Sequence, residues 1–302
     1  MTVTRLLPVF LALALVACGS PEERAAEHLK KATQLYEQGD LVKAKLEAQN
    51  TLQIEPKNAQ ARYLLAELAE KDKDFRGAIG HLLVAVDSDP DYLEPRIKLG
   101  NYYFLGKAAD KAEEQAQAAL KLAPDNPEVL LLDARVKYLK GDKAGAIKSA
   151  DAALAADPDL PDAIIFRAGL YAESKDFDSA FKLVDAGIKR LPADKSENLR
   201  QFRLQLLAAS GRRDEIESDL IRLAQDYPDN TQYRYALAQL YQSEKRPEAA
   251  ENVLKELVAL EPDNNEHKIN LVKLLVIEGK VDDAEALLRD YVKQNPENAD
   301  LQ

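Results

Sequence analysis

Apolar and polar positions along this chain follow the period of amphipathic helices, and prolines interrupt the pattern at regular intervals. A second break precedes most of these prolines by about seventeen residues, as at Gly39-Asp40 and Lys73-Asp74. Because proline ends a helix and Asp or Asn caps the next one, each unit is predicted to be a pair of helices. The prolines are spaced by 34 residues, once by 36, and are Pro56, Pro90, Pro124, Pro158, Pro192, Pro228, Pro262 and Pro296.

Small residues recur at two places in most units, numbered here so that the turn proline is position 32. Position 8 carries Ala32, Ala66, Gly100, Ala134, Ala168 and Ala238, and position 20 carries Ala44, Ala78, Ala112, Ala146, Ala180, Ala250 and Ala284. Small residues that face each other allow paired helices to approach closely. The sixth unit instead has Leu204 and Ile216, and a two-residue insertion around Ala193–Ser196. We expect a local change of curvature there, or alternatively only a lengthened surface turn.

The period, the two small positions and the closing proline resemble the tetratricopeptide repeat, with eight copies over residues 25–296. The resemblance implies an all-α, right-handed superhelical solenoid in which the first helix of each pair lines a concave groove. Each repeat is stabilised by stacking on its neighbours. Residues 297–302 are expected to begin a ninth helix or to be a truncated end, which points to a longer chain or to a partner against the last repeat.

The resemblance also implies that positions 2, 5, 9, 12 and 13 of the first helices hold a peptide in the groove. The candidate peptide-binding residues are Tyr36, Tyr63, Ile97, Asn101, Phe104, Leu131, Arg135, Tyr138, Ile165 and Tyr235. The lysine and asparagine clamp of the chaperone-binding subfamily is absent, since only Asn101 matches it. We therefore expect an amphipathic helix or an extended apolar peptide as the partner, with aromatic anchors. The alternative is that these aromatic residues belong to the repeat whether or not a ligand binds.

Residues 1–17 have the layout of a secretory signal peptide, because Arg5 precedes an apolar run that ends at Ala17. The sequence Leu-Val-Ala-Cys that ends at Cys18 resembles the lipobox of bacterial lipoproteins. This resemblance implies lipid attachment at Cys18 and a place in the cell envelope. Gly19 after the cysteine implies the outer membrane of a Gram-negative bacterium, facing the periplasm. The alternative is an ordinary signal peptide that is cleaved elsewhere.

Residues 18–24 are predicted to join the lipid almost directly to the first helix. Ser20 is placed to cap this helix, Pro21 to occupy its first turn, and Glu23 to complete a capping box. The array is therefore expected to lie close to the membrane.

Composition and charge exclude several classes of function. The chain has 41 basic and 52 acidic side chains and a net charge of −11, which is the wrong sign for binding nucleic acid. With one cysteine, it cannot form a disulfide or a cysteine-based metal cluster within itself. His28, His81 and His267 lie in different repeats, and no phosphate-binding loop is present. We expect no enzymatic activity, no metal, no cofactor and no small-molecule substrate.

Charged residues also occupy position 7, which is usually Leu, in three consecutive repeats. These residues are Asp133, Arg167 and Arg203. Because unpaired buried charges are costly, we expect a structural network in which Asp133 pairs with Arg167 or Lys137.

These features predict a non-catalytic scaffold or adaptor for protein partners, anchored in the bacterial envelope. Fold-level analogy favours support for the assembly or export of a surface structure, such as a pilus or an exopolysaccharide. The alternatives are an export subunit that contacts a polymer, and an adaptor or regulator of an envelope peptidase.

Overall fold

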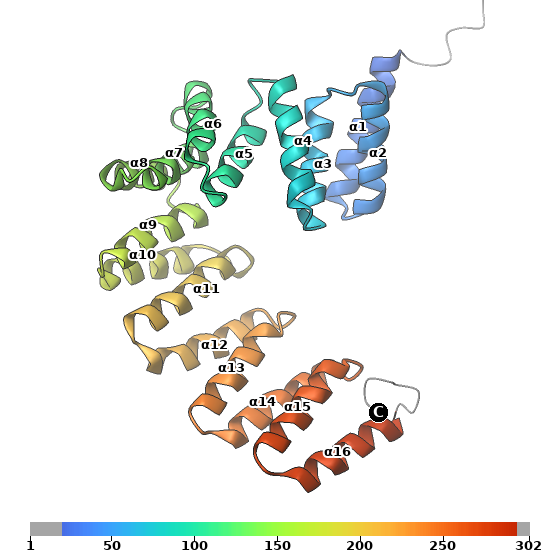
Figure 1. Ribbon diagram of the computed structural model, residues 1–302, viewed down its shortest axis with the longest axis vertical. Helices are drawn as coiled ribbons and strands as arrows, with labels where there is room; N and C mark the ends of the chain where they lie inside the picture. The colour runs from blue at the N-terminus through green and yellow to red at the C-terminus, as the bar shows by residue number, and fades with distance from the viewer. Residues whose placement is uncertain (1–19, 295–302) are drawn as a thin grey trace, which may run out of the picture. The chain divides into compact units, whose positions relative to one another are not determined.

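The computed structural model describes residues 20–294, and all regular structure among them is helical (Figure 1). Sixteen α-helices and one short 3-10 helix follow one another through the described residues. The chain divides into two compact units, residues 1–157 and 158–302. Within each unit, every described helix packs against its neighbours in the sequence. The predicted all-α array of helix pairs is confirmed.

The first unit contains four pairs, with α1, α3, α5 and α7 as first helices. The helices are α1 (Pro21–Glu37), α2 (Leu41–Ile54), α3 (Ala59–Lys71), α4 (Phe75–Ser88), α5 (Leu93–Leu105), α6 (Ala109–Leu122), α7 (Pro127–Leu139) and α8 (Lys143–Ala156).

The second unit also contains four pairs, with α9, α11, α13 and α15 as first helices. The helices are α9 (Pro161–Glu173), α10 (Phe177–Arg190), α11 (Ala193–Ser210), η1 (Arg213–Glu215), α12 (Ile216–Asp226), α13 (Gln232–Ser243), α14 (Pro247–Leu260), α15 (Asn265–Ile277) and α16 (Val281–Gln294).

The turn inside each pair contains one residue with left-handed backbone geometry, always at position 15. In four repeats this residue is glycine, and in the other four it is lysine. The residues with positive φ are Gly39, Lys73, Lys107, Gly141, Lys175, Gly211, Lys245 and Gly279. Glycine adopts this conformation without steric cost, whereas lysine accepts it at a penalty that the packed helices on both sides must offset.

The residue after this turn caps the second helix wherever it is an aspartate. Asp40, Asp74, Asp142 and Asp176 each accept a hydrogen bond from the backbone N–H three residues later. Ala108 has nearly the same backbone angles as Asp142 but offers no side-chain acceptor. The helix starts predicted at these four aspartates are therefore confirmed, and α6 begins at the same register without a cap. After the turn prolines, Asn58 and Asn126 cap the next helix as predicted, but Asp91 and Asp159 do not, because α5 and α9 begin one residue later, after Tyr92 and Leu160.

Arginines at position 4 fasten the turns between repeats. Arg62 donates two hydrogen bonds to the backbone carbonyl of Pro56, Arg96 donates one to the carbonyl of Pro90, and Arg234 repeats the contact on Pro228. Each guanidinium thus binds the carbonyl of the turn proline and ties the turn to the first helix of the next repeat.

The small residues at positions 8 and 20 form the tightest part of the core. The alanines at these positions are at most 2% exposed. A methyl group on Gly100 would lie 2.6 Å from Cδ2 of Leu132 and 3.3 Å from Cβ of Gln115. The close approach of helices that the sequence predicted at these positions is confirmed.

The sixth repeat differs from the others in its helices as well as in its sequence. Ala193–Ser196 form the first turn of α11, so the lengthened surface turn considered from the sequence is wrong. The shorter α12 is preceded by η1. Leu204 and Ile216 are partly buried against the cluster that contains Leu237. The change of curvature stays a prediction.

The charged residues at position 7 are held by local partners. Asp133 accepts a hydrogen bond from the ammonium of Lys137 at 2.6 Å, which is one of the two expected pairings, and also contacts Ser149. Arg203 pairs with Asp185 at 2.7 Å and with Asp219. Arg167 is buried, with its guanidinium 3.8 Å from the centre of the Tyr171 ring.

The predicted capping box at the start of the array is confirmed. Glu23 N–H donates to Ser20 Oγ at 3.1 Å, and Ser20 N–H donates to the Glu23 carboxylate at 2.8 Å. The predicted signal peptide over residues 1–17, the lipid attachment at Cys18 and the expected ninth helix over residues 297–302 lie outside the described residues. None of the helices described is both long enough and apolar enough to span a membrane.

Candidate protein-binding surface

In the first unit, the candidate peptide-binding residues lie on α1, α3, α5 and α7. Six of them are half-buried, which leaves part of each side chain accessible: Tyr36, Tyr63, Asn101, Phe104, Arg135 and Tyr138. The term first-helix surface is used below for these six residues together with Leu105, which follows Phe104 and is 73% exposed.

Two of the predicted peptide-binding residues belong to the core instead. Ile97 is 6% exposed and packs against Ala119 and Val129, and Leu131 is 3% exposed. Position 5 points between adjacent helices when it carries a branched aliphatic residue in the third and fourth repeats. Little of either side chain is available to a ligand, so neither forms part of an accessible binding surface.

The structure brings three of the predicted residues together across α5 and α7. Arg135 Nη1 donates a hydrogen bond to Asn101 Oδ1 at 2.8 Å. The same guanidinium lies 5.9 Å from the centre of the Phe104 ring, within the range of a cation–π contact. Arg135 is thereby held in a fixed orientation beside an accessible aromatic ring, with Leu105 next to it in the sequence.

A second cluster, between α3 and α5, was not identified from the sequence. Lys98 Nζ lies 2.6 Å from a carboxylate oxygen of Glu70, and the hydroxyl of Tyr102 donates to the other oxygen at 2.8 Å. The Lys98 ammonium also lies 5.9 Å from the centre of the Tyr63 ring. In the sequence, the only indication of this cluster is that Glu70 and Lys98 carry opposite charges and lie 28 residues apart, a little less than one repeat.

Tyrosine rings extend this second cluster. The rings of Tyr63 and Tyr92 have centres 5.4 Å apart and are tilted by 59°. Burial, together with Glu94 and Glu67, raises the pKa of the Tyr92 hydroxyl to about 12. At the start of the unit, the Lys71 ammonium lies 5.5 Å from the Tyr36 ring. Aromatic rings that lie within about 6 Å of a lysine or arginine side chain therefore recur from α1 to α7.

In the second unit, Ile165 and Tyr235 are half-buried on α9 and α13. The Tyr235 hydroxyl lies 2.5 Å from Nδ1 of His267, and Nε2 of the same ring lies 2.9 Å from a carboxylate oxygen of Glu261. Tyr235 also lines a cavity of about 250 Å³ between α13, α14 and α15. The other residues lining it are Ala238, Gln239, Gln242, Leu254, Asn270, Lys273, Leu274 and Ile277.

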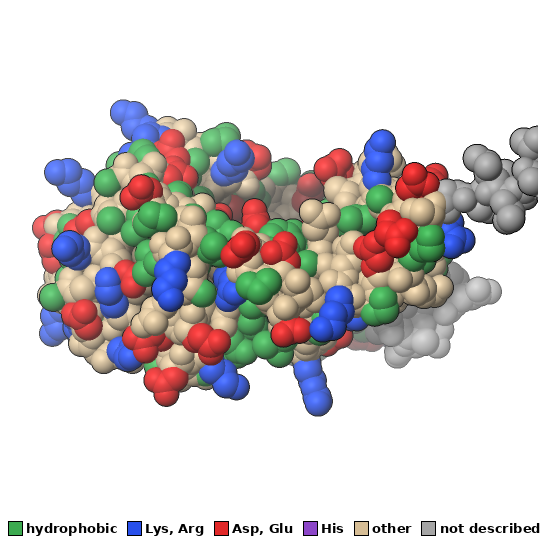
Figure 2. All heavy atoms as spheres, turned by 90° about the horizontal axis from the view of Figure 1, so that it is seen from above, with side chains coloured by type: hydrophobic (Ala, Val, Ile, Leu, Met, Phe, Trp, Pro, Cys, Tyr) green, Lys and Arg blue, Asp and Glu red, His purple; other side chains and the backbone are tan. Residues whose placement is uncertain are grey.

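These surfaces combine features that favour the binding of another protein. Accessible aromatic and aliphatic side chains provide apolar area, and neighbouring charges are already oriented by hydrogen bonds, so fewer rotamers must be ordered on binding. Figure 2 shows one face of the molecule, on which basic, acidic and hydrophobic side chains are interspersed. Among residues 20–294, no group of three His, Cys, Asp or Glu side chains is placed to hold a metal ion.

Paired helices, small residues at their crossing and a partly apolar surface on the first helices define a helical-repeat protein that contacts other proteins. A sequence model of the tetratricopeptide repeat matches residues 35–91, 207–269 and 243–302, and a second model of the same repeat matches residues 98–161. The chain belongs to the tetratricopeptide repeat family. It is a protein–protein interaction scaffold, a class that is typically non-catalytic.

Several solved structures share this fold at low sequence identity. PilF of Pseudomonas aeruginosa is 18% identical with a TM-score of 0.53, and the match covers 75% of this chain and all of PilF. PilW, a widely conserved type IV pilus biogenesis factor, is 19% identical with a TM-score of 0.56, covering 70% of this chain and 98% of PilW. Yeast Tom70 is 17% identical with a TM-score of 0.59, covering 91% of this chain and 56% of Tom70. A search of curated proteins gave no match.

Proposed function

We propose that this protein is a scaffold of the bacterial envelope that binds a protein partner through the first-helix surface and supports the assembly or export of a surface structure. The observation that carries the proposal is the pairing of accessible aromatic rings with pre-oriented charges on α3, α5 and α7. Phe104 beside Arg135 is the best-defined instance. Such a surface suits an amphipathic helix or an extended apolar peptide with a few polar groups.

The envelope location is supported by the sequence of the N-terminus. The apolar run that ends in the lipobox-like Leu-Val-Ala-Cys18 indicates a lipid anchor. The N-cap Ser20 lies two residues after that cysteine and α1 begins at Pro21, so the proposed tether between lipid and repeats is short. A scaffold that is fixed at the membrane would hold its partner close to an assembly or export complex of the envelope.

Pilus assembly is the favoured pathway among those that use such proteins. PilF and PilW have the same repeat fold, and PilW is a type IV pilus biogenesis factor. At 18% and 19% identity the likeness shows only the fold, so the pathway rests on analogy. Export of an exopolysaccharide is the other process that fits an anchored scaffold.

Photo-crosslinking in the native envelope tests the proposal. A photoreactive residue is placed at Phe104 or at Tyr138 on the first-helix surface, and at the exposed Lys148 on the second helix α8 as the matched control. We expect one discrete protein adduct from the two surface positions and none from Lys148. Mass spectrometry of the adduct names the partner.

The other outcomes separate the alternatives. Heterogeneous adducts that carry carbohydrate would favour a subunit that contacts the exported polymer. An adduct with an envelope peptidase would favour the adaptor role. Adducts from Phe104, Tyr138 and Lys148 alike would contradict a specific first-helix surface.

A further inference from the structure

Glu67 on α3 lies among tyrosine side chains from three successive repeats of the first unit. Burial is the main cause of the raised pKa of Tyr36, Tyr63 and Tyr92, and the charge of Glu67 contributes to all three. Because effects of this kind are short-ranged in salt solution, Glu67 is close to all three hydroxyl groups. The Glu67 side chain is 24% exposed, so solvent still reaches it. The term acidic tyrosine cluster is used below for these four residues together with Glu94, whose charge acts on two of the same rings.

Carboxylates outnumber cations around this cluster. The Lys98 ammonium lies 2.6 Å from Glu70 and 3.8 Å from Glu67, so one cation serves two carboxylates. A second cation, Lys71, lies beside a ring at the edge of the cluster. Glu94 is exposed, and no ion pair joins it to a cation among residues 20–294. Three carboxylates therefore face two ammonium groups, and one of the three has no partner in the part of the chain described.

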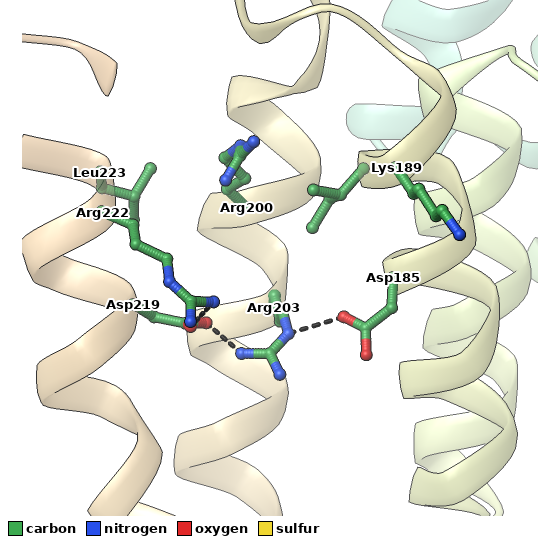
Figure 3. Close-up of a pocket in the computed structure, with 8 residues that line it drawn as sticks. Asp185, Lys189, Arg200, Arg203, Asp219, Arg222 and Leu223 are labelled. Atoms are coloured by element: carbon green, nitrogen blue, oxygen red, sulfur yellow. Dashed lines mark hydrogen bonds and ion pairs between the residues drawn. The ribbon is translucent and has the colours of Figure 1, made fainter. Parts of the chain in front are cut away.

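The charged residues around Arg203 in the second unit are, by contrast, balanced by one another. Figure 3 shows Arg203 between Asp185 and Asp219, and it pairs with both. The nearby Arg200 pairs with Asp226 at 3.3 Å. The acidic tyrosine cluster differs because its carboxylates can still accept a cation from outside the chain.

We propose that the acidic tyrosine cluster receives a lysine or arginine side chain of the protein partner, so that the partner segment is basic as well as apolar. Carboxylates and the faces of tyrosine rings both attract a cation. Lys98 already shows this arrangement, because its ammonium pairs with Glu70 and lies 5.9 Å from the centre of the Tyr63 ring. The inference rests on the proposed function, since the cluster shares Tyr36 and Tyr63 with the first-helix surface.

The distribution of charge on the first-helix surface favours one orientation of such a partner. The carboxylates lie at α3 and at the start of α5, whereas Arg135 lies on α7 and is hydrogen-bonded to Asn101. Phe104 and Leu105 supply accessible apolar area for the rest of the segment. The net charge of −11 also draws a basic segment towards the protein and speeds its association.

Three synthetic amphipathic peptides with leucine and alanine at the same positions test the proposal. They carry lysine, glutamine or glutamate at the same polar positions, and their binding to the full chain is measured by fluorescence anisotropy at constant ionic strength. We expect the lysine peptide to bind about tenfold more tightly than the glutamine peptide, and the glutamate peptide to bind most weakly. The double variant Glu67→Gln, Glu94→Gln should bind the lysine and glutamine peptides with nearly equal affinity, with unchanged helical circular dichroism.

The matched control is Glu114→Gln, Glu128→Gln, which removes the same charge from exposed positions of the first unit. Glu128 occupies position 2 of the fourth repeat, as Glu94 does in the third, but Asn126 stands where the third repeat has Tyr92. This control should keep the preference for the lysine peptide. An equal loss of preference in both double variants would show that only net charge matters and would overturn the proposal.

The remaining outcomes separate this inference from the function on which it rests. Equal binding of all three peptides to the unsubstituted protein would overturn the basic partner and leave an apolar peptide surface in place. Phe104→Ala should weaken all three peptides alike, because it removes apolar area and no charge. Unchanged binding of all three to Phe104→Ala would contradict the first-helix surface itself, and the absence of binding by any peptide would count against both proposals.

Discussion

Gly100 illustrates how closely the paired helices approach at the residue scale. We predict that Gly100→Ala lowers the free energy of unfolding by about 1–3 kcal/mol, because the new methyl group meets Leu132 at 2.6 Å and the core must shift. Gly80→Ala on α4 is the matched control, since no atom lies within 4 Å of a methyl group there. That substitution should raise stability by about 0.5–1 kcal/mol through helix propensity. Urea unfolding followed by circular dichroism measures both, and equal stabilisation by the two changes would contradict the packing argument.

Glu47 on α2 is the carboxylate with the clearest pH dependence. Hydrogen bonds from Lys31 and His28 lower the pKa of Glu47 to about 2. A depressed pKa means that its stabilisation is complete above the ordinary value of about 4.5 and is lost as the pH falls toward 2. We predict that Glu47→Gln lowers the free energy of unfolding at pH 7 by about 1–3 kcal/mol.

The difference between Glu47→Gln and the unsubstituted protein should shrink as the pH falls from about 4.5 toward 2, because Glu47 takes up a proton in the unfolded chain before it does in the folded protein. Chemical unfolding at a series of pH values gives this difference directly. A difference that is constant over the whole range would show that the ion pair does not account for it.

Residue-scale chemistry was predicted unevenly from the sequence. Asp133 paired with Lys137 as expected, because residues four apart on a helix are neighbours whatever the tertiary structure. Ile97 and Leu131 were misplaced, because the family positions alone do not state whether a side chain points outward or between adjacent helices. The pair of Lys98 and Glu70 joins two repeats and required the structure.

At the element scale, the second helices α2, α4, α8 and α10 each begin with an aspartate cap. Asp142 accepts a hydrogen bond from Gly145 N–H at 2.8 Å, whereas Ala108 has the same role in the backbone but no acceptor. We predict that Ala108→Asp raises the free energy of unfolding by about 1 kcal/mol and that Asp142→Ala lowers it by a similar amount. Thermal and urea unfolding of the two variants provide the check. A loss for Asp142→Ala without a gain for Ala108→Asp would mean that α6 is constrained by packing alone.

Helix boundaries were predictable because their causes are local. A helix is ended by proline and begun by an aspartate cap, and each of these acts within a few residues. The pair of helices in each repeat could therefore be predicted from the sequence. In the sixth repeat, local signals did not suffice to predict the helix boundary. The position of its insertion was visible in the sequence, but whether Ala193–Ser196 form a turn or the beginning of α11 was decided by the packing of that helix.

At the scale of the whole molecule, the N-terminus is predicted to decide where the protein acts. We predict that Cys18→Ser moves the protein from the membrane fraction to the soluble fraction of the envelope and abolishes labelling by radioactive palmitate. Stable anchoring requires more than one acyl chain, so loss of the acylation site should release the chain completely. The Cys18→Ser protein should keep its helical circular dichroism. Membrane retention without palmitate labelling would contradict a lipid anchor.

The sequence by itself determined the repeat, its period, the helix pairs and the positions where helices cross, because these depend on proline, small residues and hydrophobic spacing within about 34 residues. Only the tertiary structure decided which side chains on the first helices remain accessible and which charges are paired. It also placed Glu67 near Tyr36, Tyr63 and Tyr92. The physical reason is that these arrangements depend on distances between helices from different repeats, and those distances follow from packing and not from local sequence.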